Sequence, residues 1–297
     1  MDGLIINILE QGFIFAIMAI GVYITYRILD FPDLSVDGTF ALGAAVTAAA
    51  LVKGVNPFIS LILAFISGIM AGGITGILHV KLKITNLLSG ILVMIGLYSI
   101  NLRIMGKANV PLFSQSTIFS NDISPVIIIA LFAILAKIVL DLFLNTKLGF
   151  ILRATGDNSQ MVTSLGIDIG TIKILGLMLS NGLVAVSGSM MAQYQRFSDV
   201  GMGTGIIVMG LASVILGEAI FKKTSWMLPT TTAILGSILY KGSISLALNL
   251  GLPPTDLKLI TCIIVIFALS LNGRKVNLSF KMLKKFKSGG VPIASDK

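Results

Sequence analysis

The sequence predicts an all-α, polytopic membrane protein with about eight to ten transmembrane helices. Hydrophobic residues make up 55% of the 297 positions and charged residues only 12%, whereas soluble domains carry about 25% charged residues. Apolar surface of this extent is stable in a bilayer, whose hydrocarbon core is itself an apolar solvent. A polar interruption near residues 30–37 further predicts a broken helix. We interpret the formal net charge of +9 as a signal of membrane orientation rather than of nucleic-acid binding.

Nine apolar segments are predicted to form the membrane helices, because a spanning helix needs about 20 mostly apolar residues. They are residues 4–26, 38–52, 57–79, 86–105, 124–144, 171–194, 203–221, 226–248 and 255–271. The second segment would rise only about 22 Å at ~1.5 Å per residue, which is short for a core about 30 Å thick. We expect one transmembrane domain over residues 1–275 and a basic cytoplasmic tail over 276–297.

The distribution of lysine and arginine predicts the orientation, since cytoplasmic loops of membrane proteins are enriched in both. The C-terminal end is basic, with Arg274, Lys275, Lys281, Lys284, Lys285 and Lys287. We therefore place the C-terminus in the cytoplasm. Nine spans then put the N-terminus outside, in a multi-pass protein of a cell membrane. The tail would also be attracted to anionic lipid.

Two patterns inside the apolar segments indicate helix packing. Ala64, Gly68, Gly72 and Gly76 recur every four residues, which places small residues on one helix face and lets a neighbouring backbone approach closely. Lys137 and Asp141 stand one turn apart. We expect them to pair or to reach the membrane interface, although ionisable groups within spans also mark transport paths.

The sequence holds no motif for an enzyme. It lacks the glycine-rich nucleotide loop that ends in Lys-Ser or Lys-Thr, and it has no His, Cys and carboxylate spacing for a metal ion. The glycines Gly201, Gly203 and Gly205 superficially resemble a phosphate loop, but no strand is predicted before them. We expect these glycines to ease a tight connection between two spans. The chain is therefore predicted to be neither an ATPase nor an intramembrane enzyme.

Asp30–Phe–Pro–Asp–Leu–Ser–Val–Asp37 is the first segment with a predicted function. Pro32 disfavours helix at the residue before it, and three aspartates are costly in hydrocarbon. Irregular polar backbone at membrane depth persists only where it lines a cavity or packs on protein. The segment is either the break of a discontinuous helix, as in transporters, or an ordinary cytoplasmic turn. Asp37 would cap the following helix under both interpretations.

The cytoplasmic stretch 146–166 is the second segment with a predicted function. It combines apolar Phe150, Met161 and Leu165 with the charged Arg153 and Asp157. Asn158 or Ser159 could cap a short helix that ends at Gly166. A short amphipathic helix at the membrane surface rests either on lipid headgroups or on a soluble partner.

These segments resemble a known family. Leu148-Gly149, Leu152-Arg153-Ala154-Thr155-Gly156-Asp157-Asn158 and Leu165-Gly166-Ile167 are similar to the coupling loop of ABC importer permeases in the branched-chain amino acid and ribose permease superfamily. Residues 31–44, Phe-Pro-Asp-Leu-Ser-Val-Asp-Gly-Thr-Phe-Ala-Leu-Gly-Ala, resemble the segment after the first span in a subgroup of tryptophan and tyrosine permeases. Residues 101–109 resemble the same subgroup, and the likeness extends over residues 1–275.

The resemblance implies an importer that takes up an amino acid, with an aromatic one favoured. It implies a second permease copy, two cytoplasmic ATPase subunits that carry ATP and Mg, and an external substrate-binding protein, with no cofactor on this chain. The residues expected to dock into the ATPase are Arg153, Ala154, Thr155, Gly156, Asp157 and Asn158. Those expected to line the translocation path are Phe31, Pro32, Asp33, Leu34, Ser35, Asp37, Thr39, Asn86, Ser89 and Asn181; Asn181 could equally form a helix-packing hydrogen bond.

Two other functions remain open from the sequence. An ion-coupled secondary transporter of a small solute would need an ion site, for which the candidates inside spans are Glu10, Lys137, Asp141 and Glu218. A structural or assembly protein would need no transport path. The polar break at Pro32–Asp37 argues against that role.

Overall fold

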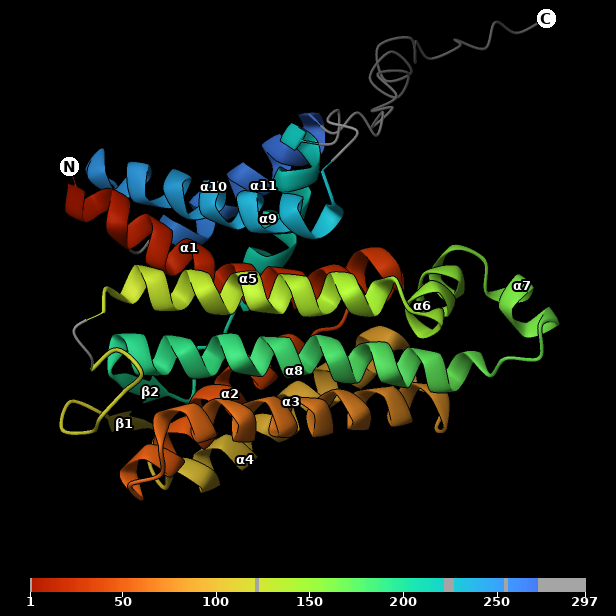
Figure 1. Ribbon diagram of the computed structural model, residues 1–297, viewed down its shortest axis with the longest axis horizontal. Helices are drawn as coiled ribbons and strands as arrows, with labels where there is room; N and C mark the ends of the chain where they lie inside the picture. The colour runs from red at the N-terminus through yellow and green to blue at the C-terminus, as the bar shows by residue number, and fades with distance from the viewer. Residues whose placement is uncertain (1, 121–122, 222–226, 254–255, 272–297) are drawn as a thin grey trace, which may run out of the picture.

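The computed structural model describes residues 2–120, 123–221, 227–253 and 256–271, which form a bundle of long helices (Figure 1). The predicted basic tail at 276–297 lies outside these residues. The bundle helices are α1 (Asp2–Tyr23), α2 (Ser35–Val52), α3 (Pro57–Val80), α4 (Asn86–Met105), α5 (Pro125–Leu144), α8 (Ile169–Gln195), α9 (Ile206–Phe221), α10 (Pro229–Asn249) and α11 (Leu257–Leu271). A π-helical turn, η1 (Ile24–Ile28), continues α1.

The all-α polytopic prediction is confirmed, and each of the nine predicted segments corresponds to a helix. Among the described residues, seven helices are long and apolar enough to cross a membrane: α1 with η1, α2, α3, α4, α5, α8 and α10. The other two are shorter, because α9 has 16 residues and α11 has 15. The 146–166 stretch adds two short helices, α6 (Lys147–Asp157) and α7 (Ser159–Ser164).

The start of α2 corrects one prediction. The helix begins at Ser35 and has 18 residues, so it rises about 27 Å at ~1.5 Å per residue and is long enough to span. Asp37 is therefore not its cap but a residue of its first turn. The cap position is Leu34, which makes no side-chain capping bond. The carboxylate of Asp33 instead accepts the backbone N–H of Ser35 at 2.9 Å.

Two short strands were not predicted. β1 (Asn109–Pro111) and β2 (Phe197–Asp199) pair antiparallel, with Val110 opposite Ser198. Figure 1 shows this pair at one end of the bundle, while α6 and α7 lie at the other end. The strands join the connection after α4 to the connection after α8, so they fix the backbone that leads into α9.

The small-residue face of α3 packs on α8, as its spacing predicted. A Cβ atom added at Gly68 would overlap the carbonyl oxygen of Asn181, and one added at Gly72 would overlap that of Leu177. Without these side chains the two backbones come into direct contact, which increases van der Waals packing where lipid supplies no hydrophobic force between helices. This contact holds α8 in place beside the break before α2.

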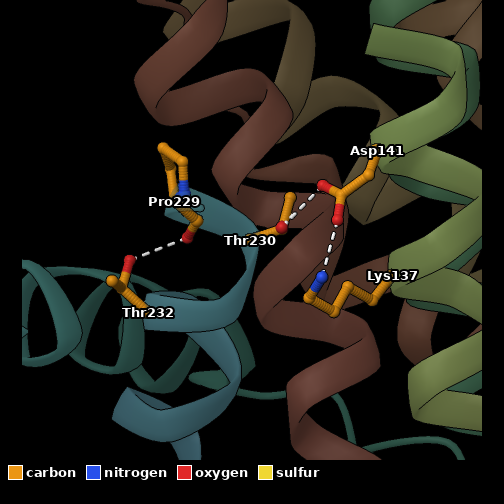
Figure 2. A network of polar contacts seen from close by, with 5 residues as sticks. All are labelled: Lys137, Asp141, Pro229, Thr230 and Thr232. Carbon is orange, nitrogen blue, oxygen red and sulfur yellow. Dashed lines mark hydrogen bonds and ion pairs between the residues drawn. The ribbon is translucent and has the colours of Figure 1, made fainter. Parts of the chain in front are cut away.

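The predicted pair of Lys137 and Asp141 is also confirmed. Nζ of Lys137 lies 2.7 Å from Oδ2 of Asp141 on the same face of α5. Figure 2 shows that the other carboxylate oxygen accepts the hydroxyl of Thr230, at 2.6 Å, from the first turn of α10. The carboxylate therefore joins two helices. These contacts satisfy both charges, which would be costly to leave unpaired inside a membrane protein.

Candidate functional site

The polar break begins where the π-helical end of α1 stops. Asp30 has a left-handed backbone (φ 49°), and the N–H of Phe31 returns to the carbonyl of Thr25 at 2.8 Å. The Phe31 side chain is buried and meets the ring of His79 edge-on, with 5.0 Å between the centroids. The chain therefore turns sharply between η1 and α2 and is anchored against the end of α3.

A buried polar cluster holds the break against α8. Oδ2 of Asp33 accepts Nδ2 of Asn181 at 2.8 Å and the hydroxyl of Ser35 at 2.8 Å. The hydroxyl of Ser35 also lies 3.2 Å from Oδ1 of Asn181. All three side chains are at most 1% exposed. The buried carboxylate is thus satisfied by hydrogen bonds, as burial requires.

The position of this cluster places the break inside the bundle. Asn181 is near the middle of the 27-residue helix α8, and Asp33 and Ser35 lie at its level because they bond to it. On the opposite side, a Cβ added at Gly90 of α4 would come within 2.8 Å of the backbone nitrogen of Leu34. This arrangement matches a discontinuous helix rather than a turn at the end of the bundle.

The residues predicted to line the path divide into three groups. The structure gathers Asp33, Ser35 and Asn181 into the buried cluster. Phe31, Thr39 and Ser89 are also buried, and the hydroxyls of the last two bond to the backbone of their own helices. Pro32 is exposed, whereas Leu34, Asp37 and Asn86 are half-buried. Asp37 also lines a cavity.

Asp37 holds the start of α9 from its position on α2. Its Oδ2 accepts the N–H of Gly205, and its Oδ1 accepts the N–H of Ile207, both at 2.8 Å. A carboxylate in this position satisfies backbone donors that a helix N-terminus leaves unpaired. Asp37 therefore caps a helix distant in sequence rather than its own. The connection with Gly201, Gly203 and Gly205 is held against α2 in this way.

A cavity of about 410 Å³ lies beside Asp37, between α2, α4 and the connection after β2. It is lined by Asp37, Gly38, Ala41, Met94, Ile95, Tyr98, Ser99, Asn101, Val200, Gly201, Gly203 and Thr204. Sequence reasoning did not select Asn101 as a site residue. The available signal was an amide in the interior of the apolar segment 86–105, but only the fold brings it to the cavity beside Asp37.

The helix α6 has two faces with different roles. Gly149, Leu152 and Thr155 are buried on one face, where a Cβ added at Gly156 would overlap the carbonyl oxygen of Ile28 in η1. The other face is exposed and carries Phe150, Arg153 and Asp157. Among the predicted coupling residues, Ala154 is half-buried and Asn158 is exposed. One side of α6 is thus fixed to the bundle end while the other is free to contact a partner.

The short helix α7 extends the exposed surface. Oδ1 of Asn158 accepts the N–H of Met161 at 3.1 Å. Of the two residues predicted to cap this helix, Asn158 is therefore the cap. Met161 is 49% exposed and Leu165 66% exposed. With the exposed Phe150 of α6, they add exposed apolar side chains to the α6–α7 end, which also carries the exposed Arg153.

The four ionisable residues considered for an ion site each have a polar partner. Glu10 accepts the hydroxyl of Tyr194 at 2.8 Å, and Glu218 lies 3.0 Å from Arg27. Lys137 and Asp141 bond to each other. Across the described ranges, no three His, Cys, Asp or Glu side chains cluster in a way that could hold a metal ion.

Comparison with known proteins places the chain in a family. Residues 4–270 match the model of the branched-chain amino acid transport system permease component. The chain belongs to this family. The resemblance to this superfamily is confirmed, and the protein is a permease subunit of an ABC-type transport system. No solved structure matches the permease.

Several relatives are permeases for different solutes. The permease is 54% identical over 274 residues to a tyrosine transport system permease protein of Clostridioides difficile, covering 92% of this chain and 93% of the relative. It is 29% identical over 233 residues to a probable branched-chain amino acid transport permease of Methanocaldococcus jannaschii, covering 71% and 73%. It is 25% identical over 221 residues to the ribose import permease of Escherichia coli, covering 71% and 68%.

Proposed function

We propose that this permease imports an aromatic amino acid, with tyrosine or a close analogue as the substrate. The identity of 54% to a tyrosine transport system permease, over nearly the full length of both chains, carries this proposal. Family membership alone would leave the solute open, because relatives below 30% identity include permeases for ribose and for branched-chain amino acids.

The energy for import comes from two cytoplasmic ATPase subunits, which hold the ATP and Mg that this chain does not bind. The exposed face of α6, with Arg153 and Asp157, and the exposed apolar side chains of α6 and α7 are the docking surface. A surface that combines both signs of charge with exposed apolar side chains suits a specific protein contact better than a lipid surface, to which amphipathic helices bind through many basic residues. An external binding protein delivers the substrate at the opposite end.

Direct contacts connect α6 to the polar break, so a movement of α6 displaces the break. Gly156 packs on the carbonyl of Ile28, and the break begins after η1. Asp33 and Ser35 then connect the break to Asn181 of α8. A shift of α6 therefore displaces η1 against α8 and opens the path beside the break to alternate sides. The ATPases drive this change only if they bind one permease conformation more tightly than the other.

Two copies of the permease form the transporter, in a prokaryotic plasma membrane with the N-terminus outside and the C-terminus in the cytoplasm. The basic residues of the loops support this orientation. It directs α6 and α7 to the cytoplasm, where ATP is available, and the β1–β2 end to the outside.

The test is Arg153→Glu in the complex purified with its ATPase and binding protein and reconstituted into vesicles. We expect substrate-stimulated ATP hydrolysis and uptake of labelled tyrosine to be lost, because the reversed charge lies on the surface that contacts the ATPase. Lys81→Glu is the control, since Lys81 is also exposed and cytoplasmic but lies outside α6. Full activity of the Arg153 variant would overturn the coupling proposal, and uptake driven by an ion gradient without ATP would favour the ion-coupled alternative.

A further inference from the structure

The cavity between α2, α4 and the connection after β2 has no role in the coupling described above. We propose that it is a substrate subsite that binds the α-ammonium group of an amino acid with an apolar side chain, with Asn101 and Asp37 as the ammonium acceptors. This inference rests on the proposed function, because it identifies where on the permease the amino acid binds.

Asn101 supplies the first argument. Its side chain is fully buried, and Nδ2 donates to the carbonyl of Gly38 at 3.2 Å. This bond orients the amide and leaves Oδ1 as the one buried side-chain polar atom without a partner among the described residues. A buried acceptor without a donor loses its hydrogen bond to water without a replacement, which is costly. A ligand N–H group at the cavity wall would remove this cost.

Asp37 supplies the second argument. It is half-buried and lines the same cavity. Each carboxylate oxygen accepts one backbone N–H, while an ionised carboxylate offers about four acceptor positions. Capacity therefore remains for a ligand. Among the described residues that line the cavity, none is basic, so the local charge favours a cation over an anion.

The remaining wall suits an apolar side chain. Ala41, Met94, Ile95 and Val200 line it together with the ring of Tyr98. Thioether and aromatic groups make favourable contacts with aromatic rings. The volume of about 410 Å³ lies within the range of about 300–1,000 Å³ that is typical of small-molecule sites. Apolar walls with a few convergent polar groups are the usual composition of such sites.

The position of the cavity suits a substrate that arrives from outside. It lies next to the residues that follow β2, and Figure 1 shows β2 at the end of the bundle opposite to α6. Asp37 is also only two residues from Ser35, which belongs to the polar cluster of the break. A ligand bound to Asp37 would therefore contact the first turn of α2, which also carries Ser35 of the polar cluster.

The proposal is tested by ligand protection of a single cysteine in the permease–ATPase complex, without the binding protein. Thr204→Cys introduces an exposed thiol in the cavity wall, in a background where the exposed Cys262 is changed to Ser. L-phenylalanine, 2-phenylethylamine and 3-phenylpropanoate are each added before a maleimide. We expect the first two compounds, which have an ammonium group, to slow labelling several-fold, and the third to have no effect. Lys53→Cys, exposed near the same end but outside the cavity, serves as the control.

A second variant identifies the acceptor. Asn101→Leu should abolish the protection by 2-phenylethylamine at Thr204→Cys, while the labelling rate without ligand is retained. Equal protection by 3-phenylpropanoate would show a site that only accepts apolar groups, and no protection by any compound would show a cavity filled by water or lipid. Either result overturns the proposal. Both are independent of the proposed function, which fails if the complete wild-type system shows no ATP-driven uptake of tyrosine.

Discussion

Oδ1 of Asp37 accepts the backbone N–H of Ile207 at 2.8 Å, so that a side chain on α2 forms the cap of α9. The same carboxylate accepts the N–H of Gly205. Among the described residues, no side chain next to α9 in the sequence accepts either of these N–H groups. The fixed position of α9 relative to α2 therefore depends on a contact between residues 170 positions apart.

Asp37→Asn is predicted to destabilise the permease. The amide keeps the size of the side chain but replaces one acceptor with a donor, so one of the two backbone N–H groups is left without a partner. The expected loss is about 1–2 kcal/mol, measured as a lower midpoint of thermal unfolding in detergent. Asp30→Asn is the matched control, because Asp30 is exposed in the same region. Equal midpoints for both variants would contradict the capping role.

Asn181→Leu is predicted to loosen the polar break. The substitution keeps the shape of the side chain but removes the donor to Asp33 and the acceptor near Ser35. A buried carboxylate that loses a hydrogen bond costs about 1–3 kcal/mol, and the unfolding midpoint should fall accordingly. Asn86→Leu, at a half-buried position on α4 outside the cluster, should change it little. A larger effect at Asn86 would argue against the cluster as the anchor of the break.

Local sequence patterns predicted much of the fold and part of the site. The bounds of α4 match the predicted segment 86–105, and the pairing of Lys137 with Asp141 followed from their spacing. Such features depend on residues within one helix. The cap on α9, the β1–β2 pairing and the approach of Asn101 to Asp37 each join distant segments. Periodicity carries no information on those contacts, so the sequence identified Asp37 as a cap but assigned it to the wrong helix.

Lys137→Met is predicted to cost more stability than the double variant Lys137→Met/Asp141→Leu. In the single variant the carboxylate of Asp141 loses its cation while only 18% of its side chain is exposed. Removing one partner of a largely buried pair is more costly than replacing both by apolar groups. The three midpoints, with that of Asp141→Leu, form a double-mutant cycle. Additive effects would show that the two charges in Figure 2 do not interact measurably.

Gly72→Ala and Gly96→Ala are predicted to have opposite effects. A Cβ at Gly72 would overlap the backbone of α8, whereas a Cβ at Gly96 meets nothing within 4 Å. Overpacking of a close contact costs about 1–3 kcal/mol, while replacing an exposed helix glycine by alanine gains about 0.5–1 kcal/mol. The unfolding midpoint should therefore fall for the first variant and rise for the second. A rise for both would show that α3 and α8 can move apart without cost.

Gly156→Ala is predicted to separate ATPase binding from transport. The new methyl group would overlap the carbonyl oxygen of Ile28 and push α6 away from η1. The exposed face with Arg153 is unchanged, so the ATPase should still co-purify with the permease. Because α6 is then no longer in close contact with η1, a movement of α6 displaces the break less. Uptake of tyrosine per ATP hydrolysed should then fall several-fold in reconstituted vesicles. A wild-type ratio would mean that the motion travels from α6 to the bundle by another contact, such as the packing of Leu152 on α8.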